Sequence, residues 1–447
     1  MTATAELARF AAGPVDPPDL LRDLFLDHVG VAAAAAVRAE STPSVRAAVR
    51  CLDPAGGPAT AIGEDRGYAP PYAALLNGCY AHSLDFDDTN TAQVGHPGAS
   101  VIPAAMAEAE RLGAGGRAFL AALAVGYEVA CRVGAALGAE SYDRGFHITA
   151  VSGIFGAVAA AGRLRGLDAA TLAHAFGLAA SKAAGSMQYL ENGAWNKRLH
   201  PGFAAHDALL VTELAAAGVV GAADAIEGRR GLLAGYTGAP HPDALTRGLG
   251  TEWVLLETAI KPYPSCRLTH AAIDAALAVR ERVPAGDRPG ATIRVELPPT
   301  AMKIVGEPVP NKLAPAGTVD AQFSVYFQVA AAWLDGRVDW ASYERIAAPD
   351  VRDLMARVST TETAALGRHA TVLTAEAGGR TVTEEVRVPL GEPGNPVGPA
   401  ALRGKFLGLA EPAYGPGRAA AIADGVAGLA DLDSVRDLIR LLRKDGR

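Results

Sequence analysis

The sequence has few of the residues on which several kinds of protein depend. It holds only four cysteines in 447 residues, Cys51, Cys79, Cys131 and Cys266, which are far apart and form no CxxC pair. This spacing excludes a zinc ribbon and a disulfide framework, and it argues against an iron–sulfur cluster. The 11 Phe, 11 Tyr and 4 Trp are too few to line the aromatic cavity of a carbocation cyclase.

Runs of positive charge and long apolar stretches are lacking as well. The 41 basic side chains stand against 48 acidic ones, a net charge of −7, and no Lys/Arg run could follow a phosphate backbone. No 18-residue stretch avoids both charge and frequent glycine, and residues 1–9 lack the basic start and apolar run of a secretory signal. We therefore expect a cytoplasmic protein that binds neither nucleic acid nor membrane.

Alanine, glycine and other small or apolar residues dominate what is present. Half of the residues are hydrophobic and only 20% are charged, so the chain can bury a large core. Its 447 residues also exceed what one core usually supports. Residues 20–259 are Ala- and Leu-rich blocks broken by Gly and Pro, which predicts helices. The apolar blocks 118–137 and 153–161 predict helices inside that domain.

The pattern changes after Pro262-Tyr263-Pro264. Residues 291–297 alternate polar and apolar side chains with period two, which is typical of a half-buried strand. Residues 370–376 and 381–388 flank Gly378-Gly379, which predicts a β-hairpin. A small sheet is therefore expected in this part of the chain.

The remaining segments complete a two-domain division. Residues 323–334 predict a helix packed on the sheet, 391–399 read as a linker, and 402–442 read as helices that rejoin the first domain. The sequence thus predicts a mainly α protein with a large all-α domain and a smaller α+β lid domain. The expected ranges are 1–262 for the all-α domain, 263–398 for the lid, and 399–447 for the returning helices.

The densest polar stretch is His82-Ser-Leu-Asp-Phe-Asp-Asp-Thr89, followed by His96-Pro97-Gly98. Its Asp85-Phe-Asp-Asp-Thr89 part resembles the nucleophile loop of haloacid-dehalogenase-like phosphatases and the acid motif of class II terpene cyclases. The phosphatase loop needs a preceding apolar strand, and residues 79–84 make a poor strand in a helical region. The scarcity of aromatics weighs against the cyclase, while a solvated acidic helix end stays open.

Basic residues gather further along the chain. Residues 196–202 contain a Lys, an Arg and a His just before an apolar helix expected at 204–218. Residues 261–270 again contain a Lys, an Arg and a His, and they lie at the expected domain boundary, where ligand clefts are common. His147 precedes the helix at 153–161, whose first N–H groups favour an anion. Each feature alone also fits a surface cluster or a core histidine. Together these acidic and basic motifs show no metal-ligand spacing. Such a set of side chains is suited to removing a proton α to a carboxylate, because cations can bind the substrate while an imidazole or amine moves the proton.

These motifs resemble, in order and across nearly the whole chain, those of the MmgE/PrpD family. The matching segments are His82–Thr89, His96-Pro97, Gly126-Tyr127-Glu128, His147-x-Thr149 with Gly153-x-Phe-Gly156, Lys197–Gly202, Lys261–Arg267 with His270, and Asp320–Ser324. The family includes 2-methylcitrate dehydratase, cis-aconitate decarboxylase and iminodisuccinate epimerase, which act on small di- or tricarboxylates without a metal. The resemblance implies a large all-α domain, an α+β lid, a homodimer and no cofactor.

The resemblance also implies the site residues. The family's active-site positions match Asp85, Thr89, His96, His147, Lys197 and Lys261 here. His200 and Arg267 join them as candidate substrate-binding residues. We predict that His96 and His147 move protons, that the two lysines and Arg267 bind carboxylates, and that Asp85 and Thr89 orient other groups. Asp87 and Asp88 are expected only to hold the turn.

The predicted function is a metal-independent lyase that removes a proton α to a carboxylate. Its substrate, a small polycarboxylate, is expected between the helical domain and the lid, and the step expels water or CO₂. Three alternatives stay open: an epimerase of a dicarboxylate such as iminodisuccinate, a relative that binds a carboxylate without turnover, and a metal enzyme. Gly98, where family members often carry Ser or Thr, and Val325-Tyr326-Phe327 in the lid depart from the family pattern.

Overall fold

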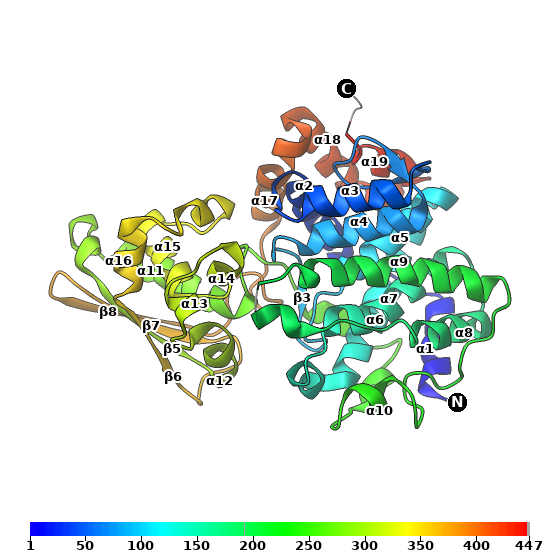
Figure 1. Ribbon diagram of the computed structural model, residues 1–447, viewed down its shortest axis with the longest axis horizontal. Helices are drawn as coiled ribbons and strands as arrows, with labels where there is room; N and C mark the ends of the chain where they lie inside the picture. The colour runs from blue at the N-terminus through cyan, green and yellow to red at the C-terminus, as the bar shows by residue number, and fades with distance from the viewer. Residues whose placement is uncertain (192, 445–447) are drawn as a thin grey trace. The chain divides into compact units, whose positions relative to one another are not determined.

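The computed structural model describes residues 1–191 and 193–444 and divides the chain into two compact units, drawn in Figure 1. The first unit comprises Met1–Ile260 and Gly398–Arg447, and the second comprises Lys261–Val397. The changes of unit after residues 260 and 397 lie two residues and one residue from the boundaries expected from the sequence, after 262 and 398. The C-terminal helices therefore fold with the N-terminal segment.

The first unit is built mainly from helices. In chain order its α-helices are α1 (Ala3–Ala12), α2 (Leu20–Arg38), α3 (Thr42–Leu52), α4 (Pro70–His82), α5 (Gly98–Leu112), α6 (Gly116–Asp143), α7 (Ile148–Leu164), α8 (Ala169–Ala179), α9 (Asn196–Ala216), α10 (Leu232–Tyr236), α17 (Pro399–Tyr414), α18 (Pro416–Ala427) and α19 (Arg436–Arg440). Two short antiparallel ladders depart from the all-α expectation. They are β1 (Ala59–Thr60) with β2 (Gly67–Tyr68), and β3 (Thr89–Asn90) with β4 (Thr258–Ala259).

Helices α6 and α7 form part of the core of this unit and confirm the two buried blocks predicted from the sequence. They approach closely because small residues face each other: a Cβ atom on Gly156 would lie 2.3 Å from the carbonyl oxygen of Gly126. By length and composition α6 could cross a membrane, but 94% of its most apolar window is buried inside the structure. That burial is typical of a core helix.

One helix boundary expected from the sequence is wrong. Pro201-Gly202 suggests a break before a helix at 204–218, but α9 begins at Asn196 and contains Pro201. The basic residues of this segment therefore lie in the first turns of α9 itself. Close packing of α4 on α9 favours this continuation, because a Cβ atom on Gly202 would lie 2.5 Å from Cys79 Sγ.

The second unit contains a four-stranded sheet with the order β6-β5-β7-β8. Its strands are β5 (Thr292–Leu297), β6 (Val358–Glu362), β7 (Thr371–Ala377) and β8 (Arg380–Val386), with β6 parallel to β5 and the other pairs antiparallel. The predicted strand at 291–297 and the predicted hairpin are confirmed. The sequence did not predict β6, because this polar strand buries only Val358.

The helices of the second unit pack against this sheet and against one another. They are α11 (His270–Arg282), α12 (Pro299–Ala301), α13 (Pro310–Leu313), α14 (Thr318–Gln322), α15 (Val325–Asp335) and α16 (Pro349–Met355). Helix α11 contacts β7 and β8, and α15, the helix expected at 323–334, packs on α11. The segment read as a linker forms a closed turn, because the Gly391 N–H donates to the Asn395 carbonyl.

We predict that Gly156→Ala destabilises the protein, because the new methyl group would clash with the α6 backbone. The expected cost is about 1–3 kcal/mol, the usual range for overpacking a core, and a urea unfolding curve would show it as a lower midpoint. Gly404→Ala in the exposed part of α17 is the matched control, because nothing lies within 4 Å of its Cβ position. That change should stabilise by about 0.5–1 kcal/mol, and equal midpoints for the two variants would contradict the packing argument.

Candidate active site

The site is built around the loop that joins α4 to α5. His82 is the last residue of α4, Asp85 to Thr89 follow it, and His96 stands two residues before α5. Asp85 has φ 52°, a left-handed conformation that few residues other than glycine adopt. Asp tolerates it better than most side chains, so the loop can turn sharply at this position.

Four imidazoles from four segments form a row. The ring centroid of His82 lies 4.7 Å from that of His96 and 5.4 Å from that of His147, on which His82 stacks. His147, the N-cap of α7, lies 5.2 Å from His200 of α9. Tyr189 packs edge-on against both His147 and His200, with its centroid 6.0 Å from each. The structure thus brings together three of the predicted site histidines and adds His82.

Burial keeps most of this row uncharged. It lowers the pKa of His82 and of His200 to about 4 and that of His147 well below its usual range. Nδ1 of His147 lies 3.0 Å from Nδ1 of His200. Because a neutral imidazole carries one N–H, one of these two rings donates from Nδ1 and the other accepts there. The pair therefore holds opposite tautomers.

An ionised carboxylate lies at one end of the row. Burial would raise the pKa of Asp87, but His82 and His96 hold it well below its ordinary value. Its Oδ2 lies 2.6 Å from His82 Nδ1 and 3.3 Å from His96 Nδ1. The expectation that Asp87 only holds the turn is therefore incomplete, since its carboxylate contacts two imidazoles.

Lys197 forms an ion pair with the acidic loop, residues Asp85–Asp88. Lys197, in the first turn of α9, donates from Nζ to Asp85 Oδ1 at 2.9 Å, and both side chains are largely buried. This ion pair joins two predicted site residues that are 112 positions apart. Arg198 donates to Ser41 Oγ at 3.4 Å.

Thr89 and Asn90 connect the loop to the end of the first unit. Thr89 pairs with Ala259 in the β3–β4 ladder, and the Asn90 side chain donates to Val254 O and Thr258 Oγ1 at 3.1 Å each. Glu128 of the Gly-Tyr-Glu motif accepts from the backbone N–H groups of residues 254 and 255. These contacts fix the strand that leads to Lys261, the first residue of the second unit.

Arg267 makes its contacts within the second unit. It donates from Nε to Glu392 Oε1 at 2.7 Å and from Nη1 to the Leu390 carbonyl at 3.0 Å, and Nη1 lies 2.7 Å from His270 Nδ1. Burial lowers the pKa of Arg267, although Glu392 opposes that effect. These contacts hold the turn near residue 392, and the expected role of Arg267 in substrate binding stays a prediction.

Two sets of hydrogen bonds, or clamps, hold the acidic loop on either side of Asp87. Lys405 of α17 donates to the Phe86 carbonyl at 3.1 Å, and its Nζ lies 3.8 Å from the Phe86 ring centroid. On the other side, Asp88 accepts from Gly98 N at 3.2 Å and from Tyr127 Oη at 2.7 Å.

Sequence reasoning assigned no role to Lys405 or Tyr127. Tyr127 stands in a family motif, which could have drawn attention to it, whereas no pattern marks Lys405. The departure at Gly98 has a steric reason, because a Cβ atom there would lie 2.4 Å from Tyr127 Oη and 2.6 Å from Asp88 Oδ2. Glycine thus permits the second clamp.

His82, Asp87 and His96 could also be considered for a metal ion, since one donor atom from each lies within 4.8 Å of the others. Metal ligands must be deprotonated, and zinc would need nitrogen ligands at about 2.0–2.1 Å. The 2.6 Å separation of His82 Nδ1 from Asp87 Oδ2 is that of a charge-assisted hydrogen bond. The arrangement therefore fits a shared proton, and the expected absence of a metal stays a prediction.

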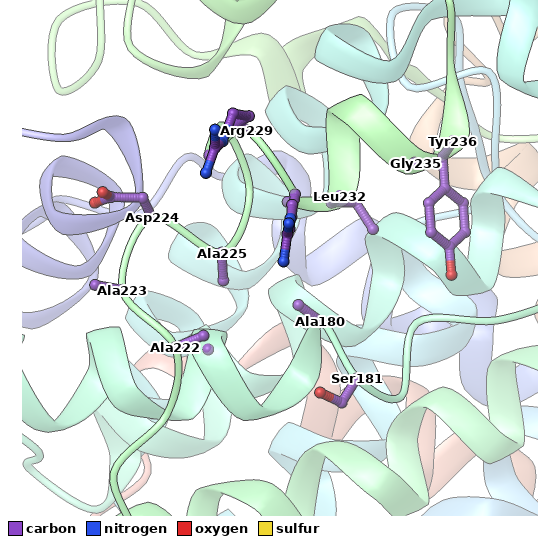
Figure 2. A pocket seen from close by; sticks show the side chains of 14 residues that line it. Ala180, Ser181, Ala222, Ala223, Asp224, Ala225, Arg229, Leu232, Gly235 and Tyr236 are labelled. Atoms are coloured by element: carbon purple, nitrogen blue, oxygen red, sulfur yellow. The ribbon is translucent and has the colours of Figure 1, made fainter.

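A cavity of about 540 Å³ in the first unit is lined by residues other than those of the histidine row (Figure 2). It lies between the end of α8, with Ala180 and Ser181, and the segment 222–236, which includes Arg229 and Tyr236. None of the predicted site residues lines it. The cavity is thus separate from the histidine row.

Comparison with known proteins identifies the family to which this chain belongs. The MmgE/PrpD N-terminal domain matches residues 5–245, and the MmgE/PrpD C-terminal domain matches residues 263–431. The chain belongs to the MmgE/PrpD family. It is similar to cis-aconitate decarboxylase of Aspergillus terreus, with 26% identity over 473 aligned positions that cover 98% of this chain and 95% of the relative.

A human protein gives a similar result over a shorter range. The chain is 31% identical to cis-aconitate decarboxylase of Homo sapiens over 303 positions, which cover 65% of this chain and 61% of the relative. These relatives support an enzyme of the carboxylate lyase type.

We predict that Asp88 is protonated at neutral pH, since burial raises its pKa to about 8. The unfolded carboxyl ionises near pH 4, so this group makes the folded state progressively less stable as pH rises from 4 to 8. Asp88→Asn has no carboxyl group to ionise. Between pH 5 and 8 the wild type should therefore lose at most about 4 kcal/mol of stability relative to this variant.

Thermal unfolding of both proteins across this pH range measures the effect. Asp88→Ala, which loses both hydrogen bonds, should be less stable than Asp88→Asn at every pH. Parallel pH profiles for wild type and Asp88→Asn would show that Asp88 is ionised in the folded protein.

Proposed function

We propose that the protein is a lyase that acts on a small di- or tricarboxylate at the histidine row. The observation that carries this proposal is the row of buried imidazoles beside the Lys197–Asp85 ion pair, all in one unit. Neutral imidazoles can accept or deliver a proton, and a fixed ammonium stabilises developing negative charge. Family membership supports the same class of reaction.

Decarboxylation is the first reaction to test, because the relatives of Aspergillus terreus and Homo sapiens are named cis-aconitate decarboxylases. When the carbon–carbon bond to CO₂ breaks, its electron pair stays on the substrate and spreads toward a neighbouring carboxylate. We propose that Lys197 stabilises that charge and that His96 or His147 supplies the proton that completes the product. Dehydration would use the same groups, with a proton removed α to the carboxylate and water expelled.

The other predicted residues take supporting roles in this proposal. Asp85 fixes the Lys197 ammonium, His200 sets the tautomer of His147 through the 3.0 Å contact, and Thr89 orients the substrate from β3. Lys261 and Arg267 remain the proposed carboxylate-binding residues of the second unit.

We predict that Lys197→Ala and His147→Gln each lower kcat/KM on the true substrate by about 10²–10⁴-fold, the usual contribution of a proton-transfer or charge-stabilising group. The assay follows product formation from a panel of di- and tricarboxylates that includes cis-aconitate. Lys182→Ala is the control, because Lys182 forms an ion pair of the same length, 2.9 Å, with Asp207 but is 45% exposed. Full turnover by the two site variants would place the reaction elsewhere.

The same panel in D₂O separates the lyase from an epimerase. An epimerase would incorporate deuterium at Cα without losing water or CO₂, whereas a lyase would release one of them. Binding of a carboxylate without exchange or turnover would indicate the non-catalytic alternative.

We predict that exhaustive chelation leaves turnover unchanged, because the His82–Asp87 contact has the length of a hydrogen bond. Activity before and after dialysis against a strong chelator, with metal content measured in parallel, checks this. Loss of activity that zinc or another divalent ion restores would contradict it and would favour a metal at His82, Asp87 and His96.

A further inference from the structure

We infer that Asp87 is the residue that positions His96 and selects its tautomer, with His82 holding Asp87 in place. This inference rests on the proposed function, because it takes His96 as a group that transfers protons. It gives Asp87 a role beyond the turn that the sequence suggested.

The contacts of the Asp87 carboxylate define the arrangement. Its Oδ2 faces Nδ1 of His82 at 2.6 Å and Nδ1 of His96 at 3.3 Å, and the two rings meet edge to face at 74°. An ionised carboxylate can only accept hydrogen bonds, so each imidazole that binds it does so through an Nδ1–H. In a neutral His96 this leaves the lone pair on Nε2, so Nε2 is the atom that takes up a proton and then delivers it to the substrate.

Exposure distinguishes the two histidines. The His82 side chain is 0% exposed, whereas the His96 side chain is 14% exposed. A group that exchanges a proton with a substrate must be reachable, so His96 suits that task. His82, which makes the shorter contact with Asp87, suits the task of fixing the carboxylate.

The contact between Asp87 and His96 is close but incompletely formed. Within residues 1–191 and 193–444, neither Asp87 Oδ1 nor His96 Nδ1 makes a hydrogen bond, although both atoms are buried. A buried polar group left unpaired costs about 1–3 kcal/mol. The His96 backbone is already held, since its N–H donates to Thr149 Oγ1 at 3.2 Å. A turn of the His96 ring would improve the contact, and catalytic hydrogen bonds often tighten when substrate binds.

The clamps on both sides of Asp87 keep its carboxylate in place. Lys405 holds the carbonyl of the preceding residue, and Asp88, the following residue, is held by Gly98 and Tyr127. The loop can therefore present Asp87 to the two histidines with little freedom of the backbone. This is the arrangement required of a positioning residue.

Asp87→Asn is the principal test. The amide can donate to His96 Nδ1 and so select the wrong tautomer, and we expect kcat to fall by about 10²–10⁴-fold with KM changed by less than about threefold. Asp207→Asn is the matched control, since Asp207 Oδ1 lies 3.0 Å from His206 Nδ1 outside the histidine row, and kcat should stay within about threefold of wild type. Thermal unfolding shows whether each variant folds. A folded Asp87→Asn variant with wild-type kcat would overturn the inference.

Two substitutions of His82 test its role as a support. A Gln side chain can still donate to Asp87, so His82→Gln should lose at most about tenfold in kcat, whereas His82→Leu should lose about as much as Asp87→Asn. If His82→Gln folds but loses as much as His82→Leu, His82 itself transfers protons and the assignment is wrong.

Nitrogen-15 NMR of labelled histidine gives a readout that does not depend on turnover. His96 should carry its proton on Nδ1 in the wild type and on Nε2 in Asp87→Asn. The same His96 tautomer in both proteins would overturn the inference even if the enzyme is active. A wild type that turns over no carboxylate but shows the expected tautomer change would refute the proposed function and leave the positioning role standing.

Discussion

The arrangement of the site depends on one buried anion, the Asp87 carboxylate. Removing a charge from water costs several kcal/mol unless hydrogen bonds replace the lost solvation. The Nδ1 of His82 at 2.6 Å provides one such bond, and His96 lies at 3.3 Å. This requirement brings two imidazoles to one carboxylate. The row continues through His147, which stacks on His82, to His200, whose ring is tilted by 50° against that of His147. Burial then keeps most of the row neutral, since it lowers the pKa of His82, His147 and His200.

Distant parts of the first unit hold this arrangement together. Lys405 comes from a C-terminal helix, Tyr127 from the long core helix α6, and Lys197 from α9, and each contacts the Asp85–Asp88 segment. The C-terminal segment, which belongs to the first unit, therefore contributes to the site as well as to the core. Gly98 has a matching explanation, because a larger residue would force Asp88 and Tyr127 apart.

The sequence predicted the features that follow from local pattern. The structure contains the buried helices, the hairpin at Gly378-Gly379 and a change from the first to the second unit near residue 260, where the composition changes. Strand β6 and the start of α9 did not follow from pattern, because one depends on pairing with β5 and the other on packing against α4. In the candidate site, the sequence drew attention to Asp85, Lys197 and three of the histidines, which the structure places near one another, but it did not predict the contacts of His82 and Asp87. Adjacent acids in a turn read as solvated, and only the fold shows that Asp87 is buried between imidazoles.

The central claim is that a row of neutral buried histidines lies beside an ionised Asp87. The most direct measurement is a pH titration of the histidine side chains by nitrogen-15 NMR from pH 8 to pH 5, with His82→Gln and His200→Gln variants to assign the signals. We predict that His82 and His200 stay neutral throughout, because burial lowers the pKa of each to about 4, and that the His82 proton resides on Nδ1. Titration of either ring near pH 6.5, the value of a solvated histidine, would contradict the account.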